Sequence, residues 1–204
     1  MATSFIAGAL AGWAIAIPVG AIAILIIETG IRRGFAAAAA AGAGAAAADG
    51  IYVTLAVVGG AALATTIAPI MEPLRIVAIG ALLAIGLRGL IRLSRTSRDG
   101  PAATDPPGSL GGTFLRFLGL TILNPATVIY FAALIVALPD IGRDAQTRAA
   151  FAAGAFLASL AWQMVLAAFS AFAHHRLPQR VQIGISVLGN LVICGFAVLL
   201  ALDL

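Results

Sequence analysis

The sequence predicts an all-α integral membrane protein that crosses the bilayer six times. Of its 204 residues, 62% are hydrophobic and only 10% are charged, and the mean hydropathy is +1.09. A soluble domain of this size is far less apolar. The apolar residues form long unbroken runs rather than the short alternating segments of a membrane β-barrel. Each run approaches or exceeds the roughly 20 residues that a helix needs to cross the hydrocarbon.

The six predicted spans follow one another along a single transmembrane domain, 1–204. They are 4–28, 36–63, 73–92, 113–138, 149–173 and 182–202. Prolines mark several of the boundaries between them, at Pro69, Pro73, Pro139 and Pro178. The segment 94–112 is rich in Gly, Pro, Asp and Arg, so we expect a solvated linker there. No basic residue precedes the first run, which favours a retained helix over a cleaved signal peptide.

The arginines predict how the chain is oriented in the membrane. All twelve basic residues are arginines, and with six spans nine of them collect on one side and three on the other. The larger group is Arg32, Arg33, Arg88, Arg92, Arg95, Arg98, Arg116, Arg176 and Arg180. Positively charged loops stay in the cytoplasm. We therefore expect the 94–112 linker inside the cell and both termini outside the cytoplasm.

A weak internal repeat divides the chain into two three-helix halves, 1–93 and 113–204. Pro18 and Pro125 fall near the middle of their spans, and G-A-L-L-A-I-G at 80–86 resembles G-N-L-V-I-C-G at 189–195. Because each half has an odd number of spans, the halves would have opposite orientations, as in many secondary transporters. Chance similarity between glycine-rich helices is the alternative.

Two spans carry signals of a helix that stops and restarts near the membrane centre. In the fourth span, Asn124 suits an N-cap and Pro125 the first helical position. In the first span, Pro18 and Gly20 offer a similar restart. The exposed N–H groups of a restarted helix favour an anion such as a carboxylate. The alternative is two proline kinks that bind nothing.

Asp49 is the one acid well inside a predicted span. A charged carboxylate at that depth costs about 2.5–3.5 kcal/mol on insertion scales. We expect it to bind an ammonium group or to carry a proton. Its structural alternative is a hydrogen bond to the end of a neighbouring helix.

Polar residues in the last two spans repeat at helical spacing and so share a face. They are Ser159, Gln163 and Ser170 in the fifth span, and Gln182, Ser186, Asn190 and Cys194 in the sixth. Lining of a transport pathway and hydrogen bonding between helices explain them equally well. Of these we take Gln163 and Asn190, together with Thr121, as candidate substrate contacts.

Other features favour structural roles. Glu28 and Arg32 are expected to form a solvated ion pair, and the small residues of 36–48 to allow close helix packing. His174 and His175 are adjacent, so they point to different faces and are expected to contact headgroups rather than a metal. The sequence shows no phosphate-binding loop, no nucleophile–base constellation and no metal-spaced cysteines, and the lone Cys194 cannot form an internal disulfide. We therefore expect no enzyme activity, no cofactor, no metal and no nucleic-acid partner.

Four short motifs together resemble the lysine-exporter (LysE/RhtB) family of amino-acid efflux proteins. They are P-V-G at 18–20, I-R-R-G at 31–34, G-x-G at 42–44 followed by A-D-G-I-Y at 48–52, and L-N-P-A-T at 123–127. The resemblance implies a six-helix exporter of the bacterial inner membrane driven by proton exchange. It also implies that both mid-span prolines, Asp49 and Asn124 belong to the translocation region. Many relatives have a second proline where this chain has Ala21, which indicates a softer first break.

The resulting hypothesis is a secondary exporter of an amino acid or a similar zwitterion, which sits in the lipid bilayer and whose oligomeric state stays open. The candidate substrate contacts are Pro18, Gly20, Asp49, Thr121, Asn124, Pro125, Gln163 and Asn190. Asp49 would couple transport to protons. The alternative is a structural or regulatory membrane subunit without transport activity.

Overall fold

The computed structural model describes residues 1–17, 20–67, 71–99, 109–124, 144–176 and 178–202, together with Thr127, Val128, Tyr130, Phe131 and Leu134. This part of the chain is helical. Its helices are α1 (Ala2–Ala16), α2 (Ala21–Arg33), α3 (Phe35–Ile67), α4 (Met71–Asp99), α5 (Leu110–Ile122), α7 (Ala145–Arg176) and α8 (Gln179–Leu202). Pro18 and Pro125 lie outside the described residues.

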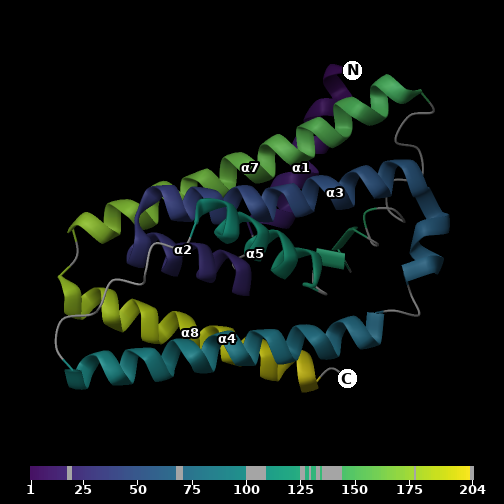
Figure 1. The fold of residues 1–204 in the computed structure, drawn as a ribbon. Coiled ribbons are helices and arrows are strands. Elements are labelled where there is room, and N and C mark those ends of the chain that lie inside the picture. Colours follow the sequence, from purple (N-terminus) through teal and green to yellow (C-terminus); the bar gives the residue numbers. More distant parts are fainter. Residues whose placement is uncertain are drawn as a thin grey trace.

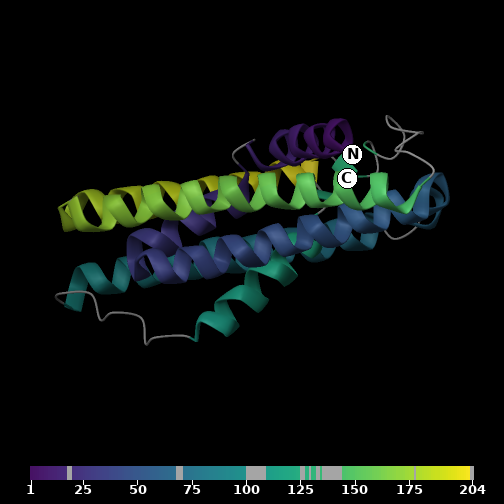
Figure 2. The same ribbon diagram turned by 90° about the horizontal axis from the view of Figure 1, so that it is seen from above.

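The helices form a bundle around α3 and α7, which run alongside each other (Figures 1 and 2). Helix α1 packs on α7, α5 packs on α3, and α2 contacts α3, α7 and α8. Helices α4 and α8 pack on each other and lie below the others in Figure 1, with α8 also touching α2. The C-terminal ends of α2, α4 and α7 lie towards one end of the bundle, and both chain termini lie towards the other (Figure 1).

Within the part of the chain that the structure describes, three helices are long and apolar enough to cross a membrane by themselves, at Phe35–Gly59, Ala145–Phe172 and Val181–Leu199. Helices α1 and α2 together make a fourth candidate span, which is bent by 77° at the break between them. Shorter apolar helices occupy Ile76–Ile91 and Leu110–Ile122. The chain is therefore an α-helical membrane protein, as predicted.

The first and fourth predicted spans are interrupted where the sequence indicates. The run 4–28 divides between α1 and α2, and the run 113–138 stops as α5 at Ile122. Helical structure returns at Thr127 and Val128. The predicted linker 94–112 is wrong at both edges, because α4 continues to Asp99 and α5 begins at Leu110. Arg and Leu are good helix formers, so an arginine-rich segment can extend a helix out of the apolar region.

Local capping explains where several helices start and stop. The Ser109 hydroxyl accepts a hydrogen bond from the Gly112 N–H (2.9 Å) at the start of α5. The Asp144 carboxylate accepts from the Thr147 N–H (2.8 Å) at the start of α7. Helix α2 ends at Gly34, whose φ of 78° lies in the left-handed region that glycine adopts most easily. Gly34 is the last residue of the I-R-R-G motif at 31–34.

Glycines bring the central helices into backbone contact. A Cβ at Gly8 or Gly12 of α1 would overlap the backbone of Phe151 or Ala155 of α7. On α3, a Cβ at Gly44 would overlap the Phe114 carbonyl of α5. The predicted close packing of the small residues of α3 is thus confirmed.

Large apolar side chains lie on both the inside and the outside of the bundle. Ile26, Val53 and Ile193 are fully buried. Val58, Val165, Phe169, Leu188 and Leu199 are more than half exposed. An apolar exterior of this extent suits a lipid environment.

Candidate functional site

A cavity of about 320 Å³ lies where the interrupted helices meet α3 and α7. Its polar lining comes from α3, α5, α7 and the helical residues beyond α5, namely Asp49, Thr121, Asn124, Thr127, Tyr130 and Gln163. Gly20, Ile22 and Ala23 at the start of α2 complete one wall. Of the eight predicted site residues, five line this cavity: Gly20, Asp49, Thr121, Asn124 and Gln163.

The N-terminus of α2 opens onto the cavity without a side-chain cap. Gly20 is the N-cap residue and has no side chain to accept a hydrogen bond. Its carbonyl accepts from the Ile24 N–H (3.2 Å), which is the first bond of the helix. The N–H groups of residues 21–23 have no acceptor within the helix. They are donors for an anion, supported by the positive end of the helix dipole.

Asn124 stands at the second break. Its carbonyl accepts from the N–H groups of Thr127 (3.1 Å) and Val128 (3.2 Å), which restarts the helix. Its side-chain Nδ2 donates to the Thr127 hydroxyl (3.1 Å). The predicted restart is therefore present, and the side chain secures it through the Thr127 hydroxyl.

Asp49 is buried at the cavity wall, with 6% of its surface exposed. The Ser159 hydroxyl of α7 donates to its Oδ2 (2.6 Å). Its observed partner is therefore a hydroxyl group, and not the helix end named as the structural alternative. A neutral donor holds the carboxylate in place without neutralising its charge.

Two polar atoms in the cavity wall have no partner within the described part of the chain. They are the Thr121 hydroxyl oxygen and Oε1 of Gln163, and both side chains are at least 94% buried. Buried polar atoms are nearly always hydrogen-bonded in native proteins. The two atoms therefore mark where a polar solute or water fits.

Two tyrosines that the sequence analysis did not single out tie the interrupted helices to their neighbours. The Tyr52 hydroxyl of α3 donates to the Ile122 carbonyl (2.5 Å) in the last turn of α5, where carbonyls lack helical partners. The Tyr130 hydroxyl donates to the Ala11 carbonyl of α1 (3.0 Å). A tyrosine inside an apolar run needs a partner for its hydroxyl, and that was the available signal.

Asn190 does not lie in this cavity, which differs from its predicted place. It lines a second cavity of about 530 Å³, where its Nδ2 donates to Glu28 Oε1 (2.9 Å) and to the Ser186 carbonyl (2.8 Å). The predicted ion pair of Glu28 with Arg32 is present (3.6 Å), but Glu28 is only 9% exposed, so the expectation that its carboxylate is solvated is wrong. Helix α8 packs against α2 and covers this carboxylate.

A cavity between two interrupted helices, inside a bundle of membrane helices, is the arrangement of a secondary transporter. The family model of the LysE type translocator matches residues 13–204, and the chain belongs to this family. The resemblance found in the sequence motifs is thereby confirmed. Neither a comparison with curated proteins nor one with solved structures gave a match. The protein is a multi-pass membrane transporter.

Proposed function

We propose that the protein is a secondary active exporter of an amino acid or similar small zwitterion, exchanging its substrate for protons across the bacterial inner membrane. One observation carries the proposal: the uncapped N-terminus of α2 and the buried Asp49 line the same cavity. They offer donors for an anion and a carboxylate for a cation. A zwitterion carries both charges.

The substrate carboxylate would lie against the first turn of α2. The Thr121 hydroxyl, which has no partner within the described part of the chain, adds a donor to the lining of the same cavity. Hydrogen bonds to a charged group are about twice as strong as those between neutral groups. The combination favours a carboxylate over a neutral carbonyl.

Asp49 would hold the ammonium group and exchange a proton when the substrate leaves. An isolated carboxylate in mid-membrane is costly, and the Ser159 hydroxyl does not neutralise it. Asp49 would therefore be paired with the substrate in one state and protonated in the other. Because one carboxylate serves both cations, substrate and proton exclude each other, which couples their movements.

The helix pairings support two inverted halves, 1–93 and 113–204. In this scheme α1 and α2 of the first half correspond to α5 in the second half, and α3 corresponds to α7. The packing of α1 and α2 on α7 then corresponds to the packing of α5 on α3. The α3–α7 and α4–α8 pairs then join equivalent helices. Six spans with both termini outside the cytoplasm follow from this arrangement and from the arginine distribution.

The test is transport by the purified full-length protein in proteoliposomes loaded with a panel of labelled amino acids. We expect exchange of at least one amino acid, driven by an imposed pH gradient. Asp49→Asn keeps the size and can still bond Ser159, but it cannot exchange a proton, so we expect pH-driven transport to fall at least tenfold. Asp144→Asn changes an exposed acid outside the cavity and serves as the control.

Two outcomes would contradict the proposal. No transport of any amino acid by well-folded protein would favour the structural or regulatory subunit. Transport by Asp49→Asn with the pH dependence of the wild type would assign Asp49 a structural role.

A further inference from the structure

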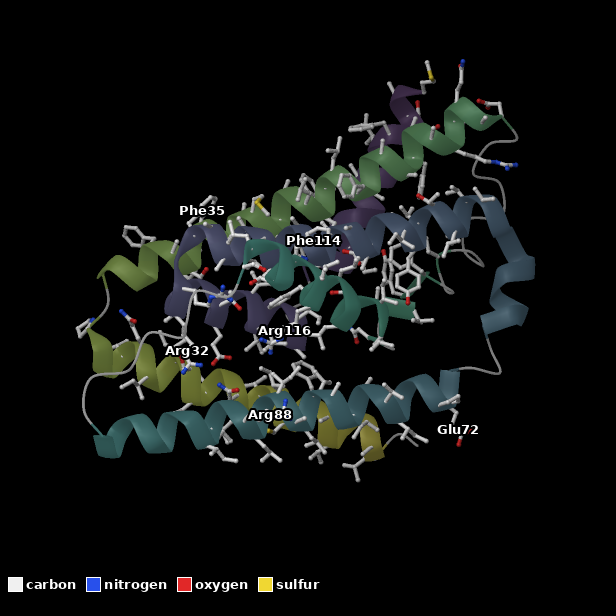
Figure 3. All side chains as sticks on the ribbon, in the orientation of Figure 1. Arg32, Phe35, Glu72, Arg88, Phe114 and Arg116 are labelled. Atoms are coloured by element: carbon white, nitrogen blue, oxygen red, sulfur yellow. The ribbon has the colours of Figure 1, made fainter. Side chains whose placement is uncertain are left out.

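The second cavity, of about 530 Å³, lies between α2, α4, α5 and α8 and is lined by arginines. Its charged and polar lining is Glu28, Thr29, Arg32, Arg33, Arg88, Arg116 and Asn190. Figure 3 shows Arg32, Arg88 and Arg116 gathered between the upper helices and the α4–α8 pair. Among the described lining residues, four guanidinium groups against one carboxylate make the cavity strongly positive.

The four arginines differ in their partners. Arg32 lies 3.6 Å from Glu28, and Arg33 donates to the Thr113 hydroxyl (3.0 Å). Within the described part of the chain, Arg88 and Arg116 have no hydrogen-bond or ion-pair partner. They come from different helices, α4 and α5, and line one cavity. An anion between them would offset their mutual repulsion and accept hydrogen bonds from both.

Part of the cavity wall is held in place by a buried network. Asn190 is 1% exposed and donates to Glu28 (2.9 Å). The missing side chain of Gly89 makes room for it, since a Cβ there would overlap the Asn190 amide. Glu28 is therefore fixed at the wall, where its charge can contribute to the binding of an ammonium group.

The arginine cavity adjoins the Asp49 cavity along two helices. Leu25 and Phe117 line the arginine cavity, whereas Ala23 and Thr121 line the Asp49 cavity. Ala23 and Leu25 are less than one helical turn apart on α2, and Phe117 and Thr121 are about one turn apart on α5. A solute bound among the arginines is thus next to the Asp49 cavity.

We propose that Arg88 and Arg116 form a loading site on the cytoplasmic side, which binds the substrate carboxylate before the substrate reaches Asp49. The excess of positive charge selects neutral and acidic amino acids and disfavours those with a cationic side chain. This inference rests on the proposed export function and names its substrate class. Attraction to such a charged cavity also raises the rate of anion binding.

An anionic lipid headgroup has the same chemistry as a substrate carboxylate, so the test must separate the two sources. Phenylglyoxal modifies accessible guanidinium groups, and mass spectrometry locates each modified arginine. The full-length protein is labelled in nanodiscs of phosphatidylcholine with glutamate, serine or lysine at matched concentrations. A second set of nanodiscs contains phosphatidylglycerol and no amino acid.

We expect glutamate and serine to slow the modification of Arg88 and Arg116 at least threefold, and lysine to protect less. Arg148, in the first turn of α7 and not part of the cavity lining, should react equally in all samples. Absence of protection, or protection by phosphatidylglycerol alone, would overturn the loading site. Equal protection by lysine would overturn the selectivity.

A second experiment measures transport by the double variant Arg88→Gln and Arg116→Gln in proteoliposomes. We expect the KM for substrate on the cytoplasmic face to rise about tenfold, as for loss of hydrogen bonds to a charged group, while the maximal rate changes less than twofold. Arg148→Gln is the control. An unchanged KM in the double variant would contradict the inference.

The two experiments separate this inference from the proposed function. If wild-type protein transports no amino acid but carboxylates still protect both arginines, export is wrong and the anion site stands. If wild-type protein transports and the carboxylates do not protect, the loading site is wrong and export stands. The labelling uses wild-type protein, so it does not depend on whether the glutamine variants fold.

Discussion

Asn124 shows how one residue can keep a membrane helix open at its centre. Its carbonyl restarts the helix through Thr127 and Val128, and its amide holds the Thr127 hydroxyl. The sequence predicts this restart because Asn before Pro is a local signal. The sequence predicts a capping side chain, and the bond from its amide to the Thr127 hydroxyl was not part of that prediction, because the Asn-Pro signal specifies only the cap.

Substitutions at Asn124 should lower the export rate to different degrees. Asn124→Ala removes the bond to Thr127 and should cost about 0.5–2 kcal/mol locally, as for loss of a helix cap. Asn124→Ser keeps a hydroxyl at the break and retains part of this stabilisation. We expect export at equal expression to fall from wild type to Ser to Ala. Equal rates for Ala and wild type would show that the break does not depend on this side chain.

Residue pairs far apart in sequence were beyond prediction. Asp49 stood out as an intramembrane acid, but its partner Ser159 is 110 positions away. Glu28 was misjudged because its burial depends on Asn190, which is 162 positions away. Both contacts come from helix packing, which no local pattern reveals.

At the scale of single helices, the contact between α1 and α7 rests on glycine at the interface. A Cβ at Gly154 of α7 would overlap the Phe5 carbonyl of α1 and lie in tight contact with the Ala9 N–H. Gly184 of α8 has open space where its Cβ would be, so it offers a matched control. Both positions lie inside helices.

Gly154→Ala should therefore destabilise the protein by about 1–3 kcal/mol, because overpacking forces two backbones apart. Gly184→Ala should be neutral or stabilising by up to about 1 kcal/mol, because alanine favours the helix. Thermal unfolding in detergent, followed by circular dichroism, measures both. A lower Tm for Gly184→Ala than for Gly154→Ala would contradict the close α1–α7 contact.

Helix interruptions were easier to predict than helix ends. Both central breaks fall at sequence signals, near Gly20 and at Asn124. The end of α4 was misplaced because its polar, arginine-rich last residues are typical of a loop, and the start of α5 because Gly111 and Gly112 are. A polar segment that leaves the membrane can keep its helical hydrogen bonds in water.

For the whole molecule, composition and run length sufficed to predict an α-helical membrane protein, and the motifs sufficed for the family. The orientation remains a prediction that single-cysteine labelling can test. In a Cys194→Ser background, Ser109→Cys and Ala145→Cys introduce thiols at exposed positions beside α5 and α7.

An impermeant maleimide should label position 145 from outside the cell, and position 109 only after the membrane is opened. This follows from placing the C-terminal ends of α2 and α4, which carry six arginines at 32–33 and 88–98, in the cytoplasm. Reversed labelling would invert the orientation. Labelling of both positions from the same side would contradict the number of spans between them.

Helix α2 has a kinetic consequence, because its two ends belong to different cavities. Its N-terminus opens on the Asp49 cavity, and Arg32 and Arg33 near its C-terminus line the arginine cavity. Thirteen residues make a rod of about 20 Å, longer than an amino acid. One solute cannot occupy both ends of the rod at once. Each transport cycle would then include a transfer along α2, and single-turnover measurements would resolve it as a lag between uptake from the cytoplasm and proton release.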